Sequence, residues 1–490
     1  MRSASWLLAA SLLMTVVTRL AFTLLPRVPL STKAVASIGD SREYIELARN
    51  LAGSQTFTRD TVPPFRPELF RTPGYPLFLA IPYVVHRPSF IVLALALQLL
   101  LALFTVWLTS RLALELGLRP ITSALAALLV GLSPSLAFLS TKLISETLFT
   151  PMLLTCVLLL NRHRQSGRAL DLIGTGVCCG LLVLVRPIAT FFPFLIALYV
   201  FLRGIAIRNS LLGVRNSVLL LASASIVVAP WVIRNGMKTG RYMISTASEH
   251  NVYLYDAATV LAAEKGINIL KARDLMMAEA EAKFGPIDTS DEATMWQKLA
   301  AVARPHLLRK PAVAVPVWLF GVSADFLNPI SVGPLLIHSG ASPAAGSANL
   351  LQSSLALLVK GKVAQAFTRA WQVRVGGAPL FILVVLACAT LFNLVLIWFG
   401  FASLFLPRTR DIRWLLLPIL YFTFLTGTVG DARFRAPIEP LLCLFAAAAI
   451  TRPPRRGPVG QTELSPELIS ELTRGSCSLG LSTPKTSHQA

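Results

Sequence analysis

The stretch SFIVLALALQLLLALFTVWLTS, residues 89–110, holds 22 consecutive residues without a charged side chain. The hydrocarbon core of a bilayer is about 30 Å thick, and a helix needs about 20 apolar residues to cross it. We therefore predict that this stretch is a membrane-spanning helix. We use its length to decide which other apolar runs of the chain are candidate membrane spans.

The composition of the whole chain extends this prediction. Of the 490 residues, 54% are hydrophobic and only 14% are charged, and the mean hydropathy is +0.65. Soluble domains carry about 25% charged residues, so the composition indicates an integral membrane protein. The 45 Lys and Arg exceed the 24 Asp and Glu and give a net charge of +21. In so apolar a chain this excess is expected to orient the spans and meet anionic lipid, and we predict no nucleic-acid partner.

Apolar runs of similar length recur along the chain. The clear candidate spans lie at 5–26, 89–110, 121–140, 145–161, 170–186, 188–203, 216–233, 378–406, 414–429 and 435–450, with weaker pieces at 311–327 and 347–360. The piece at 311–327 crosses the membrane, dips in and returns, or lies on the surface. We expect an all-α fold, a polytopic bundle of about 10–12 transmembrane helices. This membrane domain covers residues 1–450, and residues 451–490 are expected to form a disordered cytoplasmic tail.

Two features of the chain have simple explanations. The N-terminal run resembles a signal peptide, but it continues from Trp6 past Arg19 to Leu25 without a clean small-residue cleavage site. We expect it to be retained as the first span. Five of the six cysteines lie in apolar runs and lack the paired spacing of a zinc or disulfide framework, so we expect them to be small core residues.

Short basic loops predict the orientation. They are the clusters at 162–168, 203–215, 408–413 and 452–456, and the positive-inside rule places them in the cytoplasm. Counting spans from them puts a first loop, 27–88, and a large loop, 234–305, outside. Residues 27–73 hold seven basic and five acidic side chains, which argues against this orientation. Because four basic clusters support the predicted orientation and only this one loop opposes it, we keep that orientation.

Ionisable residues at the ends of the spans gather on the predicted outer face. They are Asp40, Glu43, Arg66, Arg71, Lys142, Glu146, Arg186, Arg234, Asp431, Arg433 and Arg435. Such residues count as functional candidates in a membrane protein. Arg and Lys bind phosphate by charge-assisted hydrogen bonds, and a nearby carboxylate can accept a proton from a hydroxyl. The set is typical of a site for an anionic lipid headgroup.

Each of these residues also has a purely structural interpretation. An arginine at a span end can extend to lipid phosphate without a specific role. Glu146 follows Ser145 and can simply begin a helix with a favourable dipole. Asp40 can cap the helix predicted by the apolar stripe that follows it. The turn containing Arg66 and Arg71 is explained by its prolines and glycine, but its arginines are not.

The motifs of the first loop resemble those of a known family. They are Asp40-Ser41, Tyr44, Leu47-Ala48, Asn50-Leu51 and Phe57, followed by Arg71-Thr72-Pro73-Gly74-Tyr75-Pro76-Leu77-Phe78-Leu79-Ala80. Further matches lie downstream in Ser145-Glu146-Thr147-Leu148-Phe149, Arg186-Pro187, Pro230-Trp231, Arg234-Asn235-Gly236 and Arg433-Phe434-Arg435. Together they resemble bacterial membrane glycosyltransferases related to dolichyl-phosphate-mannose protein mannosyltransferases and to the lipid A aminoarabinose transferase.

The resemblance implies a C-type (GT-C) glycosyltransferase fold with short interfacial helices in the first outer loop. It implies a sugar donor on a polyprenyl phosphate and an active site at the outer face of a bacterial cytoplasmic membrane. Asp40 matches the catalytic carboxylate and Glu146 the second acidic position. The candidates for binding phosphate or sugar are Arg71, Tyr75, Lys142, Arg186, Arg234, Arg433 and Arg435. The acceptor is a glycan, a lipid or a protein.

The expected reaction is an inverting displacement, in which Asp40 accepts the proton of the acceptor hydroxyl and arginines stabilise the departing lipid phosphate. We expect no cofactor and no metal, because no DxD pair stands in an outer loop and the histidines are scattered. The alternative function is a transporter, flippase or assembly component for lipid-linked saccharides. Transporters place polar groups near the bilayer midplane and often contain repeated halves, and neither feature is found in this sequence.

Overall fold

The structure is a computed structural model that describes residues 2–24, 39–331, 380–428 and 430–451, with residues 335, 362, 364, 365 and 368 between them. All regular secondary structure in the described part of the chain is helical, and this part contains no strand. The expectation of an all-α fold is therefore confirmed. The weak apolar piece at 347–360, the beginning of the first loop and the predicted tail after Thr451 lie outside the described residues.

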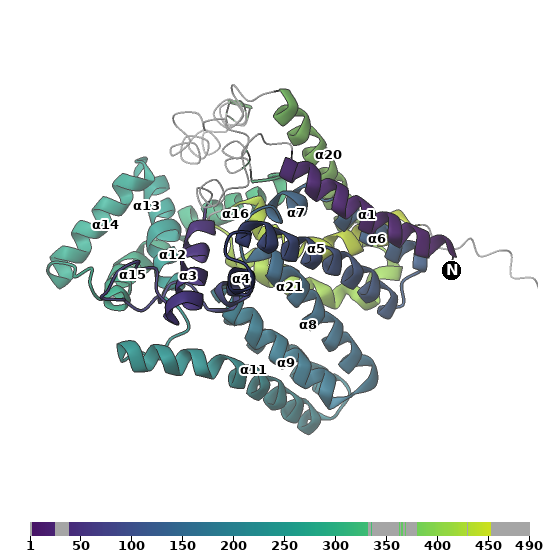
Figure 1. The fold of residues 1–490 in the computed structure, drawn as a ribbon, viewed down its shortest axis with the longest axis horizontal. Coiled ribbons are helices and arrows are strands. Elements are labelled where there is room, and N and C mark those ends of the chain that lie inside the picture. The colour runs from purple at the N-terminus through teal and green to yellow at the C-terminus, as the bar shows by residue number, and fades with distance from the viewer. Residues whose placement is uncertain are drawn as a thin grey trace, which may run out of the picture. The chain divides into compact units, whose positions relative to one another are not determined.

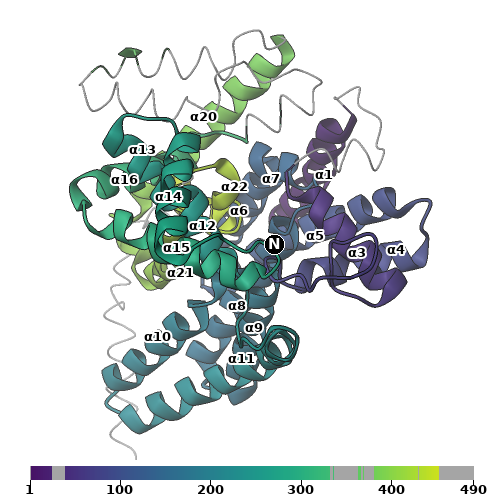
Figure 2. The ribbon, with the colours of Figure 1, turned by 90° about the vertical axis from the view of Figure 1, so that its left-hand side faces the viewer.

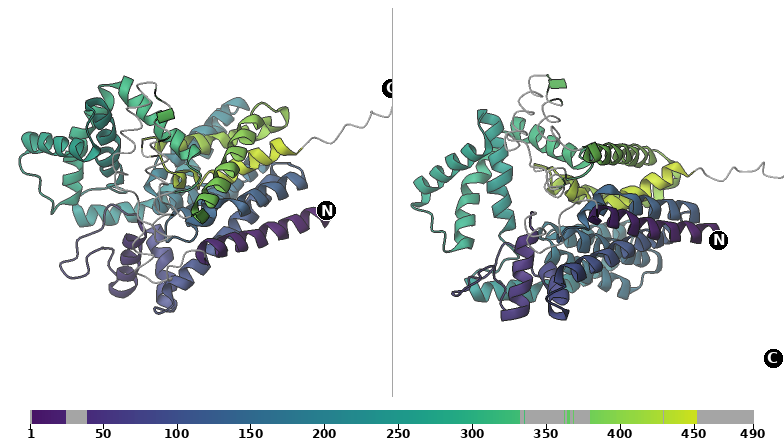
Figure 3. Two further views of the ribbon diagram at one scale, coloured as in Figure 1. Left: turned by 90° about the horizontal axis from the view of Figure 1, so that it is seen from above. Right: turned by 45° about the horizontal axis from the view of Figure 1, so that its top comes forward.

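Nine apolar helices of different lengths form the main body of the described residues. They are α1 (Arg2–Leu24), α5 (Phe90–Glu115), α6 (Pro120–Leu132), α8 (Glu146–Ser166), α9 (Ala169–Val185), α10 (Phe192–Ala206), α11 (Ser210–Thr239), α20 (Leu380–Ser403) and α23 (Glu439–Ile450) (Figure 1). Helix α9 packs between α8 and α11, and α10 packs on α11 (Figure 2). Helix α6 contacts α1, α5 and α23, and α20 runs beside α23 (Figure 3).

Local sequence signals set the ends of these helices. Pro120 occupies the first turn of α6, where its missing N–H is not needed. The side chain of Asn209 accepts a hydrogen bond from Leu212 N and begins α11. Gly167, with φ of +68°, ends α8 in the left-handed conformation.

The number of helices that could span a membrane is lower than expected. Among the described residues, five are long and apolar enough, or up to six if the bent pair α15 and α16 counts as one span. Four further apolar helices have only 10–17 residues, among them α6, α9 and α23. Within the described residues, length and composition thus give five or six spans where 10–12 were expected for the chain, and several predicted spans are broken into shorter helices. The run at 121–140, for example, is divided at Ser133 and continues as α7 (Pro134–Leu139).

Helix α8 separates two chemically different ends of the bundle. Its first residue is Glu146, and its last turns carry Arg162 and Arg164. Arg162 pairs with Glu115 at the end of α5, with Nη2 2.7 Å from Oε1. Twenty-one helical residues extend about 30 Å, the thickness of a bilayer's hydrocarbon core. The arginine-rich loops and the Glu146 end thus lie at opposite ends of α8.

A labelling experiment tests the proposed orientation of these ends. In a cysteine-free background, a cysteine at Asp60 is expected to react with an impermeant thiol reagent in intact cells. A cysteine at Gln165, which is exposed at the basic end of α8, is expected to react only after the cells are permeabilised. The reverse pattern would overturn the orientation.

Two helices form within the first loop, as the family resemblance implied. Helix α3 (Ser41–Ser54) buries one face through Tyr44, Ile45, Leu47 and Ala48. Helix α4 (Gly74–Val85) packs against α3 and against α9. A Cβ atom on Gly74 would lie 2.7 Å from Leu184 O, so the close approach of α4 to α9 requires glycine here.

The predicted outer loop at 234–305 is a folded helical unit. After α11 it forms α12 (Ala247–Asn251), a π-helical turn (Val252–Ala257), α13 (Ala258–Lys265), α14 (Ile269–Phe284) and α15 (Glu292–Leu308). These helices share a core of their own around Tyr253, Leu261, Met276 and Leu299. They lie together at the left of Figure 1. Helix α16 (Pro311–Leu327) follows α15 at an angle of 100°, so the apolar piece at 311–327 is a helix that turns sharply away from the preceding one.

Candidate functional site

Asp40 lies directly before α3, where a capping residue would stand. Its backbone oxygen accepts a hydrogen bond from Tyr44 N at 3.2 Å, but its side chain caps nothing. The carboxylate instead contacts two arginines from distant parts of the chain. Arg71 Nη2 lies 2.8 Å from Oδ1, and Arg433 Nη1 donates to Oδ2 at 3.3 Å. Helix capping therefore does not account for this carboxylate.

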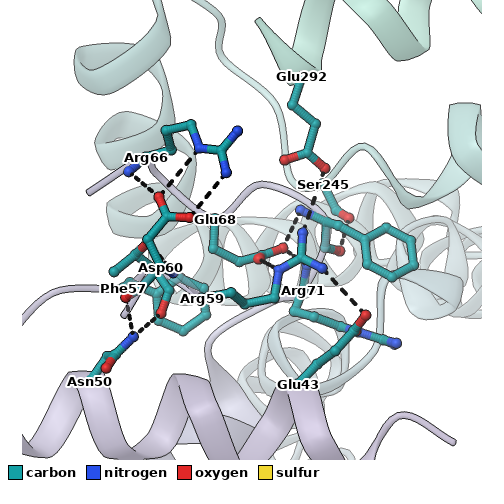
Figure 4. Close-up of polar contacts among 12 residues, drawn as sticks. Glu43, Asn50, Phe57, Arg59, Asp60, Arg66, Glu68, Arg71, Ser245 and Glu292 are labelled. Atoms are coloured by element: carbon teal, nitrogen blue, oxygen red, sulfur yellow. Dashed lines mark hydrogen bonds and ion pairs between the residues drawn. The ribbon is translucent and has the colours of Figure 1, made fainter. Parts of the chain in front are cut away.

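Arg71 joins the turn after Phe70 to helix α3. Its Nε donates to Glu43 Oε2 at 2.7 Å, one turn along α3 from Asp40. Its guanidinium lies over the rings of Tyr44 and Phe70, at 5.0 and 4.5 Å from the centroids. Arg71 thus binds both acidic groups at the start of α3, Asp40 and Glu43, with one planar cation. Figure 4 shows Arg71 beside Glu43.

Glu68 fixes the backbone that presents Arg71. Its Oε1 accepts hydrogen bonds from Phe70 N and Arg71 N, both at 2.8 Å. The same carboxylate, only 3% exposed, pairs with Arg59 on the other side of the loop. Glu68 and Arg59 were not singled out from the sequence. The turn composition around Pro67 gave no signal that this glutamate is buried.

The charges around Asp40 set its protonation. Burial alone would raise its pKa, but the positive charges of Arg71 and Arg433 outweigh burial and hold the pKa of this carboxyl at about 2. The pKa of Arg433 is raised in return, since its burial is outweighed by the charges of Asp40 and Glu146. Asp40 is therefore ionised at every physiological pH while both arginines contact it.

A second carboxylate–arginine pair lies beside the first. Glu146 begins α8, as the sequence suggested, but its side chain also contacts Arg186, with Oε1 2.7 Å from Nη1. Ser145 connects the two pairs, because its Oγ accepts a hydrogen bond from Tyr44 at 3.3 Å and donates to Glu146 Oε2 at 3.4 Å. The charge of Arg186 also reaches Asp40 and lowers its pKa further.

Tyr75 and Lys142 lie on a buried polar link behind these pairs. Tyr75 packs edge-on against Tyr44, with ring centroids 4.8 Å apart, and donates to Gln98 Oε1 at 2.8 Å. Gln98 Nε2 donates to the backbone oxygens of Ser140 and Lys142 at 2.9 and 2.8 Å. Burial lowers the pKa of the Lys142 amine to about 7. Tyr75 thus positions the segment before α8, and sequence reasoning had no signal for Gln98.

Two of the predicted phosphate-binding arginines are engaged by backbone carbonyls. Arg234 donates to Glu68 O and Phe57 O at 3.1 and 3.2 Å, and so ties α11 to the first loop. Arg435, 2% exposed, donates to Asp325 O, Phe326 O and Glu439 Oε2 at 3.0, 2.9 and 3.2 Å. The structure brings Arg71, Arg186 and Arg433 together around Asp40 and Glu146, and it places Arg234 and Arg435 in supporting positions.

In the described part of the chain, no group of three or more His, Cys, Asp and Glu side chains is placed to hold a metal ion. The positive charge at this site comes from guanidinium groups of three separate segments. Three arginines face three carboxylates, those of Asp40, Glu43 and Glu146. An anion can replace a carboxylate as the partner of these arginines. The carboxylate oxygen that loses its arginine can then accept a proton.

Comparison with known proteins finds similarity at the level of the fold. No protein family and no curated protein matches the sequence. Among solved structures, the chain is similar to the archaeal oligosaccharyltransferase AglB of Archaeoglobus fulgidus in complex with an inhibitory peptide and a dolichol-phosphate, at 12% identity and a TM-score of 0.47. It is similar to the apo form of the Archaeoglobus fulgidus oligosaccharyltransferase at 15% identity and a TM-score of 0.49.

The matches cover 91% of this chain but 50% of the oligosaccharyltransferase chain in each of these structures. The chain thus spans about half the length of the solved proteins that it resembles. Similarity at this level concerns the path of the helices and carries no argument about individual residues. The resemblance to the narrower mannosyltransferase and aminoarabinose transferase family stays a prediction.

Proposed function

We propose that this protein transfers a sugar from a polyprenyl-phosphate donor to an acceptor hydroxyl at the outer face of a bacterial cytoplasmic membrane. The observation that carries the proposal is the Asp40 carboxylate, which is held between Arg71 and Arg433 at one end of a bundle of apolar helices. A lipid phosphate reaches such a position from the bilayer surface. An acceptor reaches it from the aqueous side.

The arginines suit a phosphate leaving group. Guanidinium groups bind phosphate oxygens through charge-assisted, often bidentate hydrogen bonds. The side chains of Arg71 and Arg433 are 15% and 32% exposed, so both can be reached by a ligand. As the bond between the anomeric carbon and the phosphate oxygen breaks, negative charge grows on the phosphate, and fixed cations stabilise it.

Asp40 and the donor phosphate then compete for the same arginines. While Arg71 and Arg433 contact Asp40, its pKa of about 2 makes it a weak base. A phosphate that takes over these cations raises the proton affinity of the carboxylate, because the charges that lowered its pKa are then shared. Donor binding therefore converts Asp40 from an ion-pair partner into a proton acceptor.

The reaction is a single displacement. The acceptor oxygen attacks the anomeric carbon on the face opposite the phosphate, its proton passes to Asp40, and the polyprenyl phosphate leaves with the bonding electron pair. The configuration at the anomeric carbon is inverted. Glu146 holds Arg186 in place beside this centre, and Arg234 and Arg435 support the loops that carry it.

Purified protein in detergent micelles tests this function. A strain that lacks the protein is expected to accumulate both substrates, so its extracted lipid-linked sugars and envelope fraction serve as donor and acceptor. The wild-type protein is expected to release polyprenyl phosphate and to add one sugar mass to an envelope component, both measured by mass spectrometry. Micelles have no two leaflets, so a transporter or flippase would produce neither change, and that outcome would refute the proposal.

A further inference from the structure

A closed set of polar contacts holds both ends of the Arg71 side chain. At the backbone end, Arg71 N donates to Glu68 Oε1 at 2.8 Å, and at the guanidinium end, Arg71 Nε donates to Glu43 Oε2 at 2.7 Å. Arg59 joins the two carboxylates, because its Nη1 donates to Glu43 Oε1 at 3.3 Å and its Nε pairs with Glu68 Oε2. Figure 4 shows Arg59 between Glu43 and Glu68. We call these four residues, Glu43, Arg59, Glu68 and Arg71, the Arg71 network.

The position of Arg59 does not depend on Arg71. The side chain of Asn50, in α3, donates through Nδ2 to the backbone oxygens on both sides of Arg59, Thr58 O at 2.7 Å and Asp60 O at 3.0 Å. The chain that carries Arg59 is therefore tied to the helix that carries Glu43. This arrangement lets Arg59 orient the Glu43 carboxylate toward Arg71.

The Arg71 network does not include Asp40. The network uses Nε of Arg71, whereas Asp40 Oδ1 lies 2.8 Å from Nη2. The aromatic rings of Tyr44 and Phe70 also lie against the guanidinium, at 5.0 and 4.5 Å from their centroids. An anion can therefore replace Asp40 at Nη2 without breaking any contact of the network.

Arg433 is held in a different way. Within the described residues, its guanidinium makes one hydrogen bond, to Asp40 Oδ2 at 3.3 Å, and lies 4.9 Å from the ring centroid of its neighbour Phe434. The two cations that contact Asp40 are thus not equivalent. Arg71 keeps its partners when Asp40 is replaced, and Arg433 loses its hydrogen bond.

We propose that Glu43 is a positioning residue that, together with Arg59, keeps Arg71 in place when the donor phosphate replaces Asp40. The inference rests on the proposed transferase function and makes Arg71 the fixed half of its phosphate site. Exposed ion pairs contribute little, but the side chain of Arg71 is only 15% exposed, and the two oxygens of Glu43 serve two arginines. A cation that is already held in its binding orientation loses less freedom when the ligand arrives, so the ligand binds more tightly.

The charge of Glu43 alone predicts the opposite effect. Glu43 is an anion beside a site for an anion, so a carboxylate that acted only through its charge would weaken phosphate binding, and its removal would strengthen that binding. Glu43→Gln separates the two roles. The amide keeps the shape of the side chain but offers one oxygen in place of two, so either Arg59 or Arg71 loses its acceptor.

Binding of undecaprenyl phosphate to the purified full-length protein in detergent micelles, measured by microscale thermophoresis, tests the proposal without requiring transfer. The wild type is expected to bind, and Glu43→Gln and Arg59→Lys are each expected to bind about threefold to tenfold more weakly. Arg59→Lys keeps a positive charge beside the buried Glu68, but a single ammonium replaces the planar group that reaches both carboxylates. The double variant is expected to bind no more weakly than the weaker single variant, because one break already releases Arg71.

Glu46→Gln is the control for the loss of a carboxylate from α3. Glu46 follows Glu43 by three residues in the same helix and also pairs with an arginine, Arg42, at 2.8 Å, but the side chain of that arginine is 73% exposed. This variant is expected to bind undecaprenyl phosphate as the wild type does. In transfer assays, Glu43→Gln is expected to raise the KM for the donor and to leave kcat near the wild-type value, because Asp40 is intact.

The possible outcomes separate the two proposals. Wild-type protein that binds no undecaprenyl phosphate, a Glu43→Gln variant that binds it as tightly as the wild type or more tightly, or additive effects of Glu43→Gln and Arg59→Lys would refute the positioning role. The transferase function would still stand if sugar transfer in micelles were observed. Conversely, binding that weakens as expected in both variants, without any transfer by the wild type, would refute the transferase and leave a protein that binds lipid phosphate through a fixed Arg71.

Discussion

Asp40→Asn is expected to lower the rate of sugar transfer by about 10²–10⁴-fold, the range typical of a lost general base. The amide has almost the same shape as the carboxylate but cannot accept the proton of the acceptor hydroxyl. The rate is measured in micelles with lipid and envelope extracts from a strain that lacks the protein. Transfer close to the wild-type rate would remove Asp40 from the chemistry.

The same variant separates proton transfer from phosphate binding. Asp40→Asn frees Arg71 and Arg433 from a competing anion, so the KM for the donor is expected to stay the same or to fall while kcat drops. A structural defect would raise the KM for the donor and reduce the amount of folded protein. The hydrogen bond from Arg71 to Glu43 does not involve Asp40 and is expected to persist in this variant, which favours an intact loop.

Asp60→Asn is the matched control. Asp60 also lies in the first loop and also pairs with an arginine, since its Oδ1 is 3.1 Å from Arg66 Nη2. The side chain of Arg66 is 69% exposed, however, and such solvent-exposed pairs contribute little to stability. Asp60→Asn is expected to keep transfer and folding near the wild-type level. A loss as large as that of Asp40→Asn would show that any charge in this loop matters equally.

The sequence predicted the longest apolar helices well, because their signal is local, whereas several other predicted spans are shorter helices. The charge-free stretch at 89–110 lies almost entirely within α5, Phe90–Glu115. The folded unit after α11 was predicted only as a polar loop. Its apolar residues, such as Tyr253, Met276 and Leu299, are spaced for packing between short amphipathic helices. A search for runs of about 20 apolar residues does not detect that pattern.

The candidate site was predicted only in part, for a different reason. Asp40 and Arg433 are 393 residues apart, so the only sequence signal for their pairing was the expectation that both lie on one membrane face. Which arginine of a motif faces the site depends on helix geometry. Arg433 and Arg435 stand two positions apart in the short helix α22 (Ala432–Arg435), and residues so spaced point to different sides of a helix.

Arg435→Met is accordingly expected to lower the stability of the fold, whereas Arg433→Met is expected to weaken binding of the donor. Arg435 is 2% exposed and Glu439 is fully buried. Removal of Arg435 takes away the cation that contacts this carboxylate and also removes a donor from the backbone oxygens of Asp325 and Phe326. Breaking a buried pair in this way costs about 3–5 kcal/mol. A typical folded protein is stable by only about 5–15 kcal/mol.

Size-exclusion chromatography and thermal unfolding in detergent measure this difference. Arg435→Met is expected to yield little monodisperse protein and a clearly lower Tm, while Arg433→Met is expected to elute and unfold like the wild type. In transfer assays, Arg433→Met is expected to raise the KM for the donor, because one of the two cations that hold the phosphate is missing. Equal stability of the two variants would contradict the structural role of Arg435.

The double variant Arg435→Met/Glu439→Gln decides whether the buried charge itself is responsible. Without Arg435, Glu439 is a buried carboxylate that has lost its contacting cation and is offset only by the more distant charge of Arg19. Glutamine removes that charge while keeping a group that can accept the hydrogen bond from Ser133. We expect the double variant to regain part of the lost Tm, because removing both charges of a buried pair costs less than removing one. The carbonyls of Asp325 and Phe326 still lack their donor, so recovery is incomplete. If the double variant were no more stable than Arg435→Met, the role of Arg435 would lie in binding those carbonyls rather than in neutralising Glu439.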